Sequence, residues 1–167
     1  MKRFRLLFLC TGNSARSQMA EAILNAKGKE RFEAASAGSQ PAARVNPLAL
    51  QTLHDFNMPW SGHAPRNVDG LQREHWDFVI TVCDRAKEAC PIFPGQPVLA
   101  HWGMPDPAEV EGDEAMKRNA FREAFLLLSR RIDLLLALPF EQLEQLALEA
   151  RVQAIAAISQ PPVAKTP

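Results

Sequence analysis

An eight-residue segment near the N-terminus constrains this chain more than any other part of its sequence. The apolar run from 4 to 9 before it predicts a buried strand, and the amphipathic stretch from 17 to 26 after it predicts a helix. A short polar connection of this kind aims successive backbone N–H groups and the helix N-terminus at one point, where they hold a negative charge. We therefore expect an oxyanion to bind this segment, which consists of Cys10, Thr11, Gly12, Asn13, Ser14, Ala15, Arg16 and Ser17.

The side chains of the segment indicate chemistry at the bound anion. Arg16 can hold two anion oxygens in a planar fork. The same positive field is expected to lower the pKa of Cys10 below the ordinary ~8.5, and Ser17 to donate to the sulfur and cap the helix. Gly12 and Asn13 tolerate the left-handed backbone of a tight loop. The alternative, a Cys10 that is only a small buried side chain, leaves the ordered run of strand, cysteine, arginine, serine and helix unexplained.

Apolar runs and helical periodicity alternate along the rest of the chain. Further strands are predicted at 32–37, 77–82 and 98–100, and further helices at 47–56 and 114–138. Strands separated by helices form right-handed parallel crossovers. The predicted fold class is therefore α/β, a three-layer sandwich with a four-stranded parallel sheet flanked by helices. In such sheets the ligand lies beyond the carboxyl ends of the strands, which places the site after Leu9 and Val82.

The length of 167 residues fits one domain, which we place at 1–139. A C-terminal helical extension is predicted at 140–158, and 159–167 is expected to be a disordered tail. The sequence leaves the role of the extension open between two alternatives. It packs on its own domain, or it contacts a partner, for example in a homodimer.

Composition excludes several classes of protein. Lys+Arg and Asp+Glu both number 19, so the basic excess of a nucleic-acid-binding protein is missing. No uncharged apolar run reaches the roughly 18 residues of a membrane span, and the short N-terminal run lacks the cleavage site of a signal peptide. We therefore expect a soluble, cytoplasmic protein that does not bind membranes. Three cysteines are too few and odd in number for a disulfide scaffold, and they direct attention to thiol chemistry.

The anion-binding segment resembles the phosphate-binding loop of the low-molecular-weight protein tyrosine phosphatases and of the arsenate reductases that share their fold. Its words Cys10-Thr11-Gly12-Asn13-Ser14, Arg16-Ser17 and Gln18-Met19-Ala20-Glu21 are most similar to the arsenate reductase branch, of the thioredoxin-coupled type. The resemblance spans 4–138 and continues in order through Ser36-Ala37-Gly38, Val82-Cys83, Cys90-Pro91, His101-Trp102-Gly103 and Asp106-Pro107. The helix after Pro139 lies outside this pattern.

The resemblance implies roles for the site residues. Cys10 is the nucleophile that attacks the arsenic of bound arsenate, and Arg16 with the loop amides holds the arsenate or phosphate oxyanion. Asp106 is the general acid that protonates the departing oxygen, so that water leaves. Ala108 stands where phosphatases of this fold usually carry an aromatic side chain against a phenol ring, and the chain has no tyrosine. A bare oxyanion is therefore the expected substrate.

Cys83 and Cys90 separate the two branches. A phosphatase needs only Cys10, because water completes its cycle, whereas a reductase needs a second thiol that attacks the first and expels arsenite. Cys83 follows the central strand. Cys90 lies in a polar segment that is expected to move, so it can attack Cys83 and pass the disulfide to an external dithiol, thioredoxin or glutathione with glutaredoxin. No bound cofactor is implied.

Two other functions remain as alternatives. One is a phosphatase for small phosphoesters or phosphotyrosine, in which Cys83 and Cys90 guard Cys10 against overoxidation. The other is a non-catalytic oxyanion or redox sensor, which would have no use for the general acid Asp106.

No metal site is expected, because the cysteines and histidines lack the spacing of zinc ligands. Thioredoxin-coupled members of the family often bind potassium, and Asn13, Glu21 and Ser36 match three residues of that site. Arg66 stands at the position of the acidic fourth residue. Its guanidinium is expected to pair with Glu21 in place of the cation.

Overall fold

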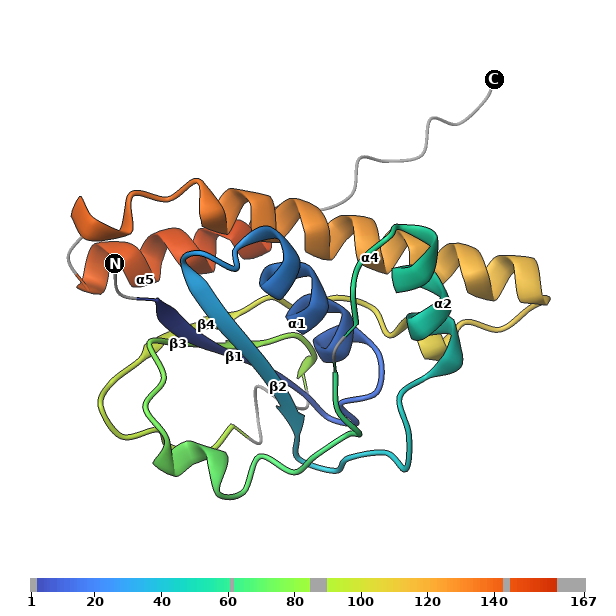
Figure 1. Cartoon of the computed structure of the whole chain (residues 1–167), viewed down its shortest axis with the longest axis horizontal. Helices are drawn as coiled ribbons and strands as arrows, with labels where there is room; N and C mark the ends of the chain where they lie inside the picture. The colour runs from blue at the N-terminus through green and yellow to red at the C-terminus, as the bar shows by residue number, and fades with distance from the viewer. Residues whose placement is uncertain (1–2, 61, 85–89, 143–144, 159–167) are drawn as a thin grey trace.

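Four parallel strands form the centre of the molecule in the order β2-β1-β3-β4 (Figure 1). The structure is a computed structural model, and it describes residues 3–60, 62–84, 90–142 and 145–158. The strands are β1 (Phe4–Cys10), β2 (Phe32–Gly38), β3 (Phe78–Thr81) and β4 (Val98–His101). Their register aligns Cys10 with Gly38, Leu9 with Thr81 and Thr81 with His101, so these strands end at one edge of the sheet.

Four α-helices lie among the described residues: α1 (Arg16–Lys27), α2 (Pro47–Asp55), α4 (Glu114–Leu136) and α5 (Gln145–Ala154). Side-chain caps start two of them, because Asn46 accepts from the backbone N–H of Leu48 and Asp113 accepts from that of Met116. Helices α1, α2 and α4 pack against one another, and α5 packs against β4. Short 3₁₀ turns occur at Leu71–Arg73, Pro107–Glu109, Phe140–Gln142 and Ile155–Ala157.

The α/β prediction with a four-stranded parallel sheet is confirmed. The predicted extra C-terminal helix is present as α5, but it is shorter than the predicted 140–158, because 3₁₀ turns occupy 140–142 before it and 155–157 after it. The turn at its start brings the Phe140 ring into a cluster with Phe4, Phe32 and Phe78, whose neighbouring centroids are 5.4–5.8 Å apart. The apolar periodicity of the stretch therefore serves packing within the chain.

The C-terminal segment is joined to the rest of the domain by buried hydrogen bonds. Trp102 Nε1 donates to Val152 O at 3.1 Å. From α4, the guanidinium of Arg131 donates to Trp102 O and Gly103 O and also to Ala156 O and Ile158 O. Of the two roles that the sequence leaves open for the extension, packing on its own domain is the one that the structure displays.

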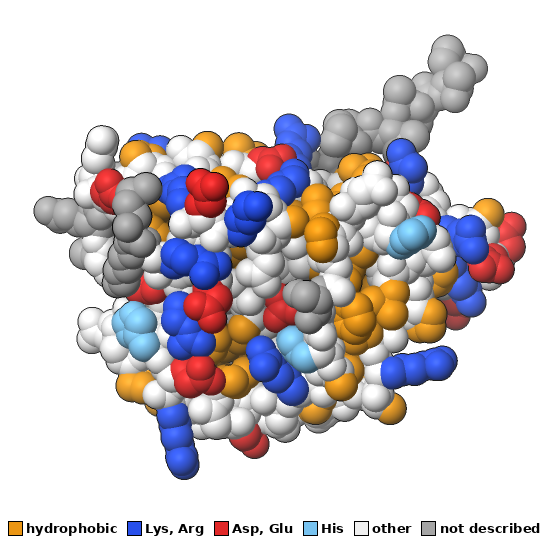
Figure 2. Space-filling view, in the orientation of Figure 1, with side chains coloured by type: hydrophobic (Ala, Val, Ile, Leu, Met, Phe, Trp, Pro, Cys, Tyr) orange, Lys and Arg blue, Asp and Glu red, His pale blue; other side chains and the backbone are white. Residues whose placement is uncertain are grey.

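The surface agrees with the zero net charge. On the face shown in Figure 2, basic and acidic side chains are interspersed. Among the described helices, none is both long and apolar enough to cross a membrane.

Candidate active site

A cavity of about 410 Å³ opens beyond the carboxyl ends of the strands. The loop between β1 and α1 lines it with residues 10–12 and 14–16, and the segments after β3 and β4 line it with Cys83, Asp84, residues 104–106 and Glu109. Most of the predicted oxyanion-binding residues therefore meet there. Asn13 and Ser17 are not among the lining residues, since both are fully buried.

The backbone of the loop is arranged for an anion. Its carbonyl groups are engaged on the outside, where Thr11 O, Gly12 O and Ser14 O accept from the backbone N–H groups of Gln40, Ala42 and Asn46. Within the described part of the chain, none of the backbone N–H groups of residues 12–15 donates to a protein acceptor. A run of free N–H groups ahead of a helix N-terminus is a concave site for an oxyanion.

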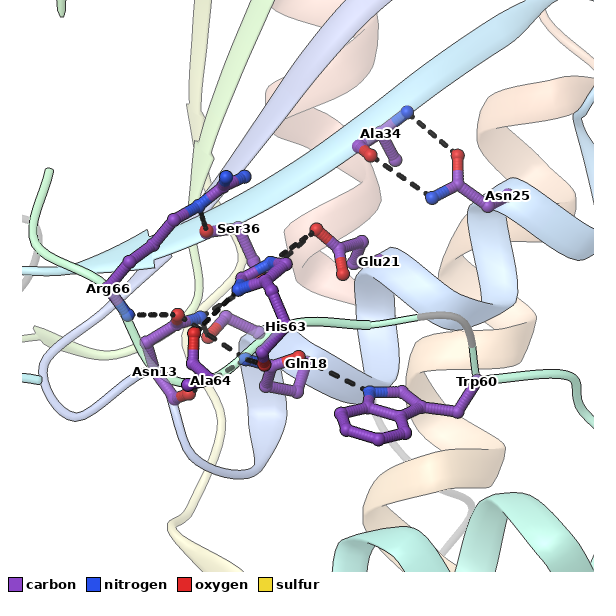
Figure 3. A network of polar contacts seen from close by, with 11 residues as sticks. Asn13, Gln18, Glu21, Asn25, Ala34, Ser36, Trp60, His63, Ala64 and Arg66 are labelled. Atoms are coloured by element: carbon purple, nitrogen blue, oxygen red, sulfur yellow. Dashed lines mark hydrogen bonds and ion pairs between the residues drawn. The ribbon is translucent and has the colours of Figure 1, made fainter. Parts of the chain in front are cut away.

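Asn13 holds the loop in this shape. It adopts the left-handed φ of 48° that the sequence predicts, whereas Gly12 does not need a positive φ. Its Nδ2 donates to Ser17 Oγ and Ser36 Oγ, both at 2.9 Å, and its Oδ1 accepts from the backbone N–H of Arg66 (Figure 3). The buried amide therefore ties the loop to α1, to β2 and to the segment around Arg66.

Ser17 differs from its predicted role. Helix α1 begins one residue earlier than expected, at Arg16, with Ala15 at the N-cap position and no side-chain cap. Ser17 is thus the second residue of the helix, and its Oγ accepts from Asn13. The prediction that Ser17 caps the helix is wrong.

A second layer of polar contacts lies behind the loop (Figure 3). Glu21 is 6% exposed, and its Oε1 lies 3.0 Å from His63 Nε2 and 3.4 Å from Ser36 Oγ. Arg66 Nε donates instead to Ser36 O at 3.0 Å. The predicted pairing of Arg66 with Glu21 is wrong, because the His63 ring occupies the place next to that carboxylate.

Gly38, the last residue of β2, permits the loop to approach the sheet. A Cβ at this position would lie 2.4 Å from Thr11 O and 2.9 Å from Cys10 O, which are backbone atoms that cannot swing aside. The sequence places a glycine at the end of the predicted strand, but the close approach that requires it depends on a residue 27 positions away.

Arg16 connects the loop to the segment that carries the predicted acid. The arginine is 9% exposed, its Nη1 donates to Met104 O at 2.9 Å, and its Nη2 lies 3.5 Å from Asp106 Oδ2. Asp106 Oδ1 also accepts from the backbone N–H of Ala108, which starts the 3₁₀ turn. The guanidinium and the carboxylate therefore face the same cavity, as the predicted roles require.

Cys83 lies against the anion loop, and it changes the chemistry of Cys10. Its Sγ lies 3.2 Å from both Thr11 N and Thr11 Oγ1. The hydrogen bond with Cys83 and burial raise the pKa of the Cys10 thiol, although the charge of Arg16 and the N–H of Thr11 act to lower it. The predicted lowered pKa is wrong for this arrangement, because the interaction with the Cys83 thiol and burial outweigh the positive charge of Arg16.

Cys90 lies outside this cavity. It lines a separate cavity of about 210 Å³ with β3 and β4 residues, including Thr81 and His101. Burial raises the pKa of its thiol. The structure thus brings Cys10 and Cys83 together and places Cys90 apart from them; residues 85–89, which the sequence predicts to move, lie outside the described residues.

Some residues of the cavity wall are absent from the sequence-based prediction. Met104, Pro105 and Glu109 line the cavity beside Asp106, and no spacing or pattern in the sequence identifies them. In the described part of the chain, no group of three or more His, Cys, Asp or Glu side chains is placed to hold a metal ion.

Known proteins share both the sequence pattern and the fold. Residues 5–151 match the family model of the low molecular weight phosphotyrosine protein phosphatases. The "Arsenate reductase" of Oceanobacillus iheyensis is 35% identical over 123 residues, which is 74% of this chain and 88% of the relative. Because the family match runs to residue 151, it includes most of α5, which the sequence-based resemblance leaves out.

Solved structures show the same similarity. The arsenate reductase of Archaeoglobus fulgidus has a TM-score of 0.60 at 30% identity, over 77% of this chain and 98% of that one. The thioredoxin-dependent arsenate reductase of Corynebacterium glutamicum has a TM-score of 0.54 at 27% identity, over 79% of this chain and 63% of that one. The family model over residues 5–151 and the 35% identical relative therefore show that the chain belongs to the low molecular weight phosphotyrosine protein phosphatase family.

Proposed function

We propose that the protein is an arsenate reductase, which converts arsenate and a dithiol to arsenite, water and a disulfide. One observation carries this proposal: a second thiol, Cys83, lies in the same cavity wall as Cys10, with its Sγ 3.2 Å from the backbone N of the adjacent Thr11. Hydrolysis of a phosphoester needs no such thiol. Reduction needs one, because two electrons must come from a pair of sulfurs. Relatives that cover most of this chain bear the name arsenate reductase.

The first step forms a bond between Cys10 and arsenic. The free N–H groups of 12–15 and the Arg16 fork hold the arsenate oxygens. The bound oxyanion is itself a base and takes the proton of the Cys10 thiol, and the resulting thiolate attacks arsenic. Asp106, in contact with Arg16 at 3.5 Å, donates a proton to the departing oxygen, which leaves as water.

The second step reduces arsenic. The Cys83 thiol gives its proton to an oxygen of the arsenic group, and the resulting thiolate, stabilised by the N–H and hydroxyl of Thr11, attacks the sulfur of Cys10. The S–As bond breaks and leaves its electron pair on arsenic, which is released as arsenite. A Cys10–Cys83 disulfide remains.

The third step returns Cys10 to its thiolate form. Cys90 attacks Cys83, expels Cys10, and leaves a Cys83–Cys90 disulfide for an external dithiol. We infer thioredoxin as the reductant, with glutaredoxin and glutathione as the other candidate, because the Corynebacterium glutamicum neighbour is thioredoxin-dependent. The proposal includes a cytoplasmic location, since the relay depends on a reducing compartment.

A phosphatase is the second candidate function, and the arrangement of Cys10, Arg16 and Asp106 favours it as a side activity. These groups would also attack, hold and protonate a phosphoester. However, Ala108 follows the Asp-Pro pair and supplies no aromatic ring against a phenol. Arsenate has no phenol ring that such an aromatic side chain would contact, so the absence of this side chain does not weaken arsenate binding.

One experiment separates the two functions. Arsenate-dependent oxidation of NADPH is measured with thioredoxin and thioredoxin reductase, and again with glutathione and glutaredoxin, next to hydrolysis of an aryl phosphate. We expect Cys83→Ser to abolish arsenate turnover and to leave aryl phosphate hydrolysis, while Cys10→Ser abolishes both. Arsenate turnover at the wild-type rate in Cys83→Ser would refute the relay, and residual activity of either kind in Cys10→Ser would refute the site.

A further inference from the structure

A chain of hydrogen bonds runs along the sheet edge between the two cavities. His101, the last residue of β4, contacts Thr81 Oγ1 through Nδ1 at 2.7 Å. Through Nε2 it contacts Asp84 Oδ1 at 2.8 Å. Asp84 directly follows Cys83 and lines the anion cavity, whereas Thr81 and His101 line the cavity that contains Cys90. The three side chains thus connect the surroundings of Cys90 with the segment that carries Cys83.

The two ends of this hydrogen-bonded chain, Thr81 and Asp84, differ in their exposure to solvent. The side chain of His101 is 18% exposed and that of Asp84 is 90% exposed. Thr81 is buried. A proton that enters at Thr81 therefore has a continuous hydrogen-bonded route through the imidazole to a carboxylate in solvent.

The position of the ring is fixed by its backbone. The side-chain amide of Gln153, on α5, accepts from His101 N at 2.9 Å and donates to His101 O at 3.3 Å. Around the ring itself, β3 contributes Thr81, and the segment after β3 contributes Asp84. Within the described part of the chain, Asp84 is the one charged group bonded to the imidazole.

Cys90 needs a proton acceptor before it can act. Burial raises the pKa of its thiol, so at neutral pH the sulfur carries a proton. Only the thiolate attacks a disulfide. Among the described residues that line its cavity, His101 is the one side chain with a basic ring nitrogen, and Thr81 Oγ1 lies 2.7 Å from its Nδ1.

We propose that Thr81 and His101 accept the proton of Cys90 when Cys90 attacks the Cys10–Cys83 disulfide, and that Asp84 passes this proton to water. The inference rests on the proposed function, because it concerns the third step of that relay. It assigns the HWG segment at 101–103 a role in thiol exchange.

The atoms and electrons of the step balance. The thiol of Cys90, which donates to Pro91 O at 3.6 Å in the structure, turns to Thr81 across their shared cavity. Its proton passes to Thr81 Oγ1 as the hydroxyl proton of Thr81 passes to His101 Nδ1, which becomes positively charged. The Cys90 thiolate forms a bond to Cys83 Sγ, and the Cys10–Cys83 bond breaks. Cys10 leaves as a thiolate beside Arg16, whose charge stabilises it. No outside oxidant or reductant is consumed.

Single-turnover exchange tests the proposal. Reduced protein is mixed with arsenate without external reductant, quenched with an alkylating agent at successive times, and mapped by mass spectrometry for the Cys10–Cys83 and Cys83–Cys90 disulfides. A second arm starts the exchange with hydrogen peroxide, which oxidises Cys10 to a sulfenic acid that condenses with Cys83. If wild type releases no arsenite in the first arm, the proposed function fails, and the second arm still measures the exchange.

His101→Gln keeps a polar side chain but cannot take up the proton. We expect this variant to accumulate the Cys10–Cys83 disulfide and to form the Cys83–Cys90 disulfide about 10²-fold more slowly at neutral pH. Because hydroxide then replaces the imidazole, the rate should rise with pH until it approaches that of wild type. The release of arsenite in the first turnover should be unchanged.

Three further variants serve as controls. Thr81→Val should slow the same exchange and Thr81→Ser should restore it. His75→Gln removes an exposed histidine that contacts Asp77 at 3.1 Å before β3, and it should exchange at the wild-type rate. Exchange in His101→Gln at the wild-type rate, or slowed by one factor at every pH, would overturn the proposal. Melting temperatures establish that the variants fold. If His101→Gln does not fold, the exchange rate of Thr81→Val is the test, and a wild-type rate in that variant would overturn the proposal.

Discussion

At the scale of single residues, the contact between Cys10 and Cys83 determines how the site is activated. The neighbouring Cys83 thiol and burial raise the pKa of Cys10. The raised pKa favours the protonated thiol of Cys10 in the free protein, and the proposed function gives the bound oxyanion a part in removing that proton. A thiol held in this way resists adventitious oxidation, because oxidants attack the thiolate.

Removal of the Cys83 sulfur should lower the pKa of Cys10. In Cys83→Ala the raising hydrogen bond is gone, while Arg16 and Thr11 N continue to lower the pKa. At a pH below this pKa, each unit of decrease raises the thiolate fraction roughly tenfold. We expect iodoacetamide to alkylate Cys10 at neutral pH at least about tenfold faster, as measured by peptide mapping. Cys90→Ala should leave the alkylation rate of Cys10 as in wild type, and an equal or slower rate in Cys83→Ala would contradict the explanation.

Gly38 should not accept a side chain. In Gly38→Ala the new Cβ meets the backbone oxygens of Thr11 and Cys10, so the loop has to shift. We expect a loss of roughly 1–3 kcal/mol in the free energy of unfolding and weaker binding of phosphate to the loop. The matched variant is Gly12→Ala, whose Cβ meets side-chain atoms only, at 3.6 and 4.0 Å. Urea denaturation should show a smaller loss for Gly12→Ala, and equal losses would show that the close approach is unimportant.

The sequence predicts the loop residues well and their partners less well. Cys10, Arg16 and the left-handed Asn13 follow from local order along eight residues. The raised pKa of Cys10 and the pairing of Glu21 with His63 depend on groups 73 and 42 positions away, which local patterns do not place. Local reasoning therefore indicates which side chains the loop brings to the cavity, and the folded chain decides which groups they contact.

At the scale of elements, α4 is joined to the end of β4 and to the C-terminal segment by one buried arginine. Arg131 is 3% exposed and donates to four backbone carbonyl oxygens. Burial lowers the pKa of its guanidinium. The four carbonyl oxygens provide hydrogen-bond acceptors for its Nη1 and Nη2 atoms. Two of those acceptors, Trp102 and Gly103, directly precede the segment 104–106. Arg131 on α4 therefore also helps to position Asp106.

Arg131→Met should loosen both attachments. One buried and three partly buried carbonyl groups would lose this donor, at a cost of about 3 kcal/mol in the free energy of unfolding. Amide hydrogen exchange should increase in the described part of 145–158 and around residue 103. Arg130→Met changes an exposed neighbour in the same helix and should stay near wild type. A similar small loss in both variants would contradict the role of Arg131.

Elements with strong patterns are predicted closely, and the C-terminal stretch is not. The strands and α1, α2 and α4 begin and end within two residues of the predicted bounds. In the C-terminal stretch, apolar residues keep a helical period, but the burial of Phe140 in an aromatic cluster turns the backbone before α5 begins. Tertiary packing overrides periodicity there.

At the scale of the whole molecule, Phe140 closes the amino-terminal end of the sheet, opposite the active site. Its ring contacts the first residues of three strands, Phe4, Phe32 and Phe78. The segment after Pro139 is therefore part of the core, although the sequence places a boundary at this point. The predicted homodimer stays a prediction, which light scattering of the full chain measures.

Phe140→Ala should destabilise the entire domain. The loss of a buried ring commonly costs roughly 3–5 kcal/mol, and all three strand starts share the contact. We expect one cooperative thermal transition at a lower temperature. Tertiary structure, followed by near-ultraviolet circular dichroism, and the unfolding of α5, followed by proteolysis or hydrogen exchange, should change together. Ile92→Ala, at a side chain that is 93% exposed, is the control and should melt like wild type. Separate transitions for α5 and the sheet would contradict a single core.

The contact of Gln153 with His101 has a consequence for how the molecule behaves among other copies of itself. Strand β4 is the outer strand of the sheet and only four residues long. The amide of Gln153 occupies both the N–H and the C=O of its last residue, as a neighbouring strand would. An outer strand that is short and already paired offers little to an approaching chain. The contact of Gln153 with His101 thereby makes strand addition at this end of β4 less favourable.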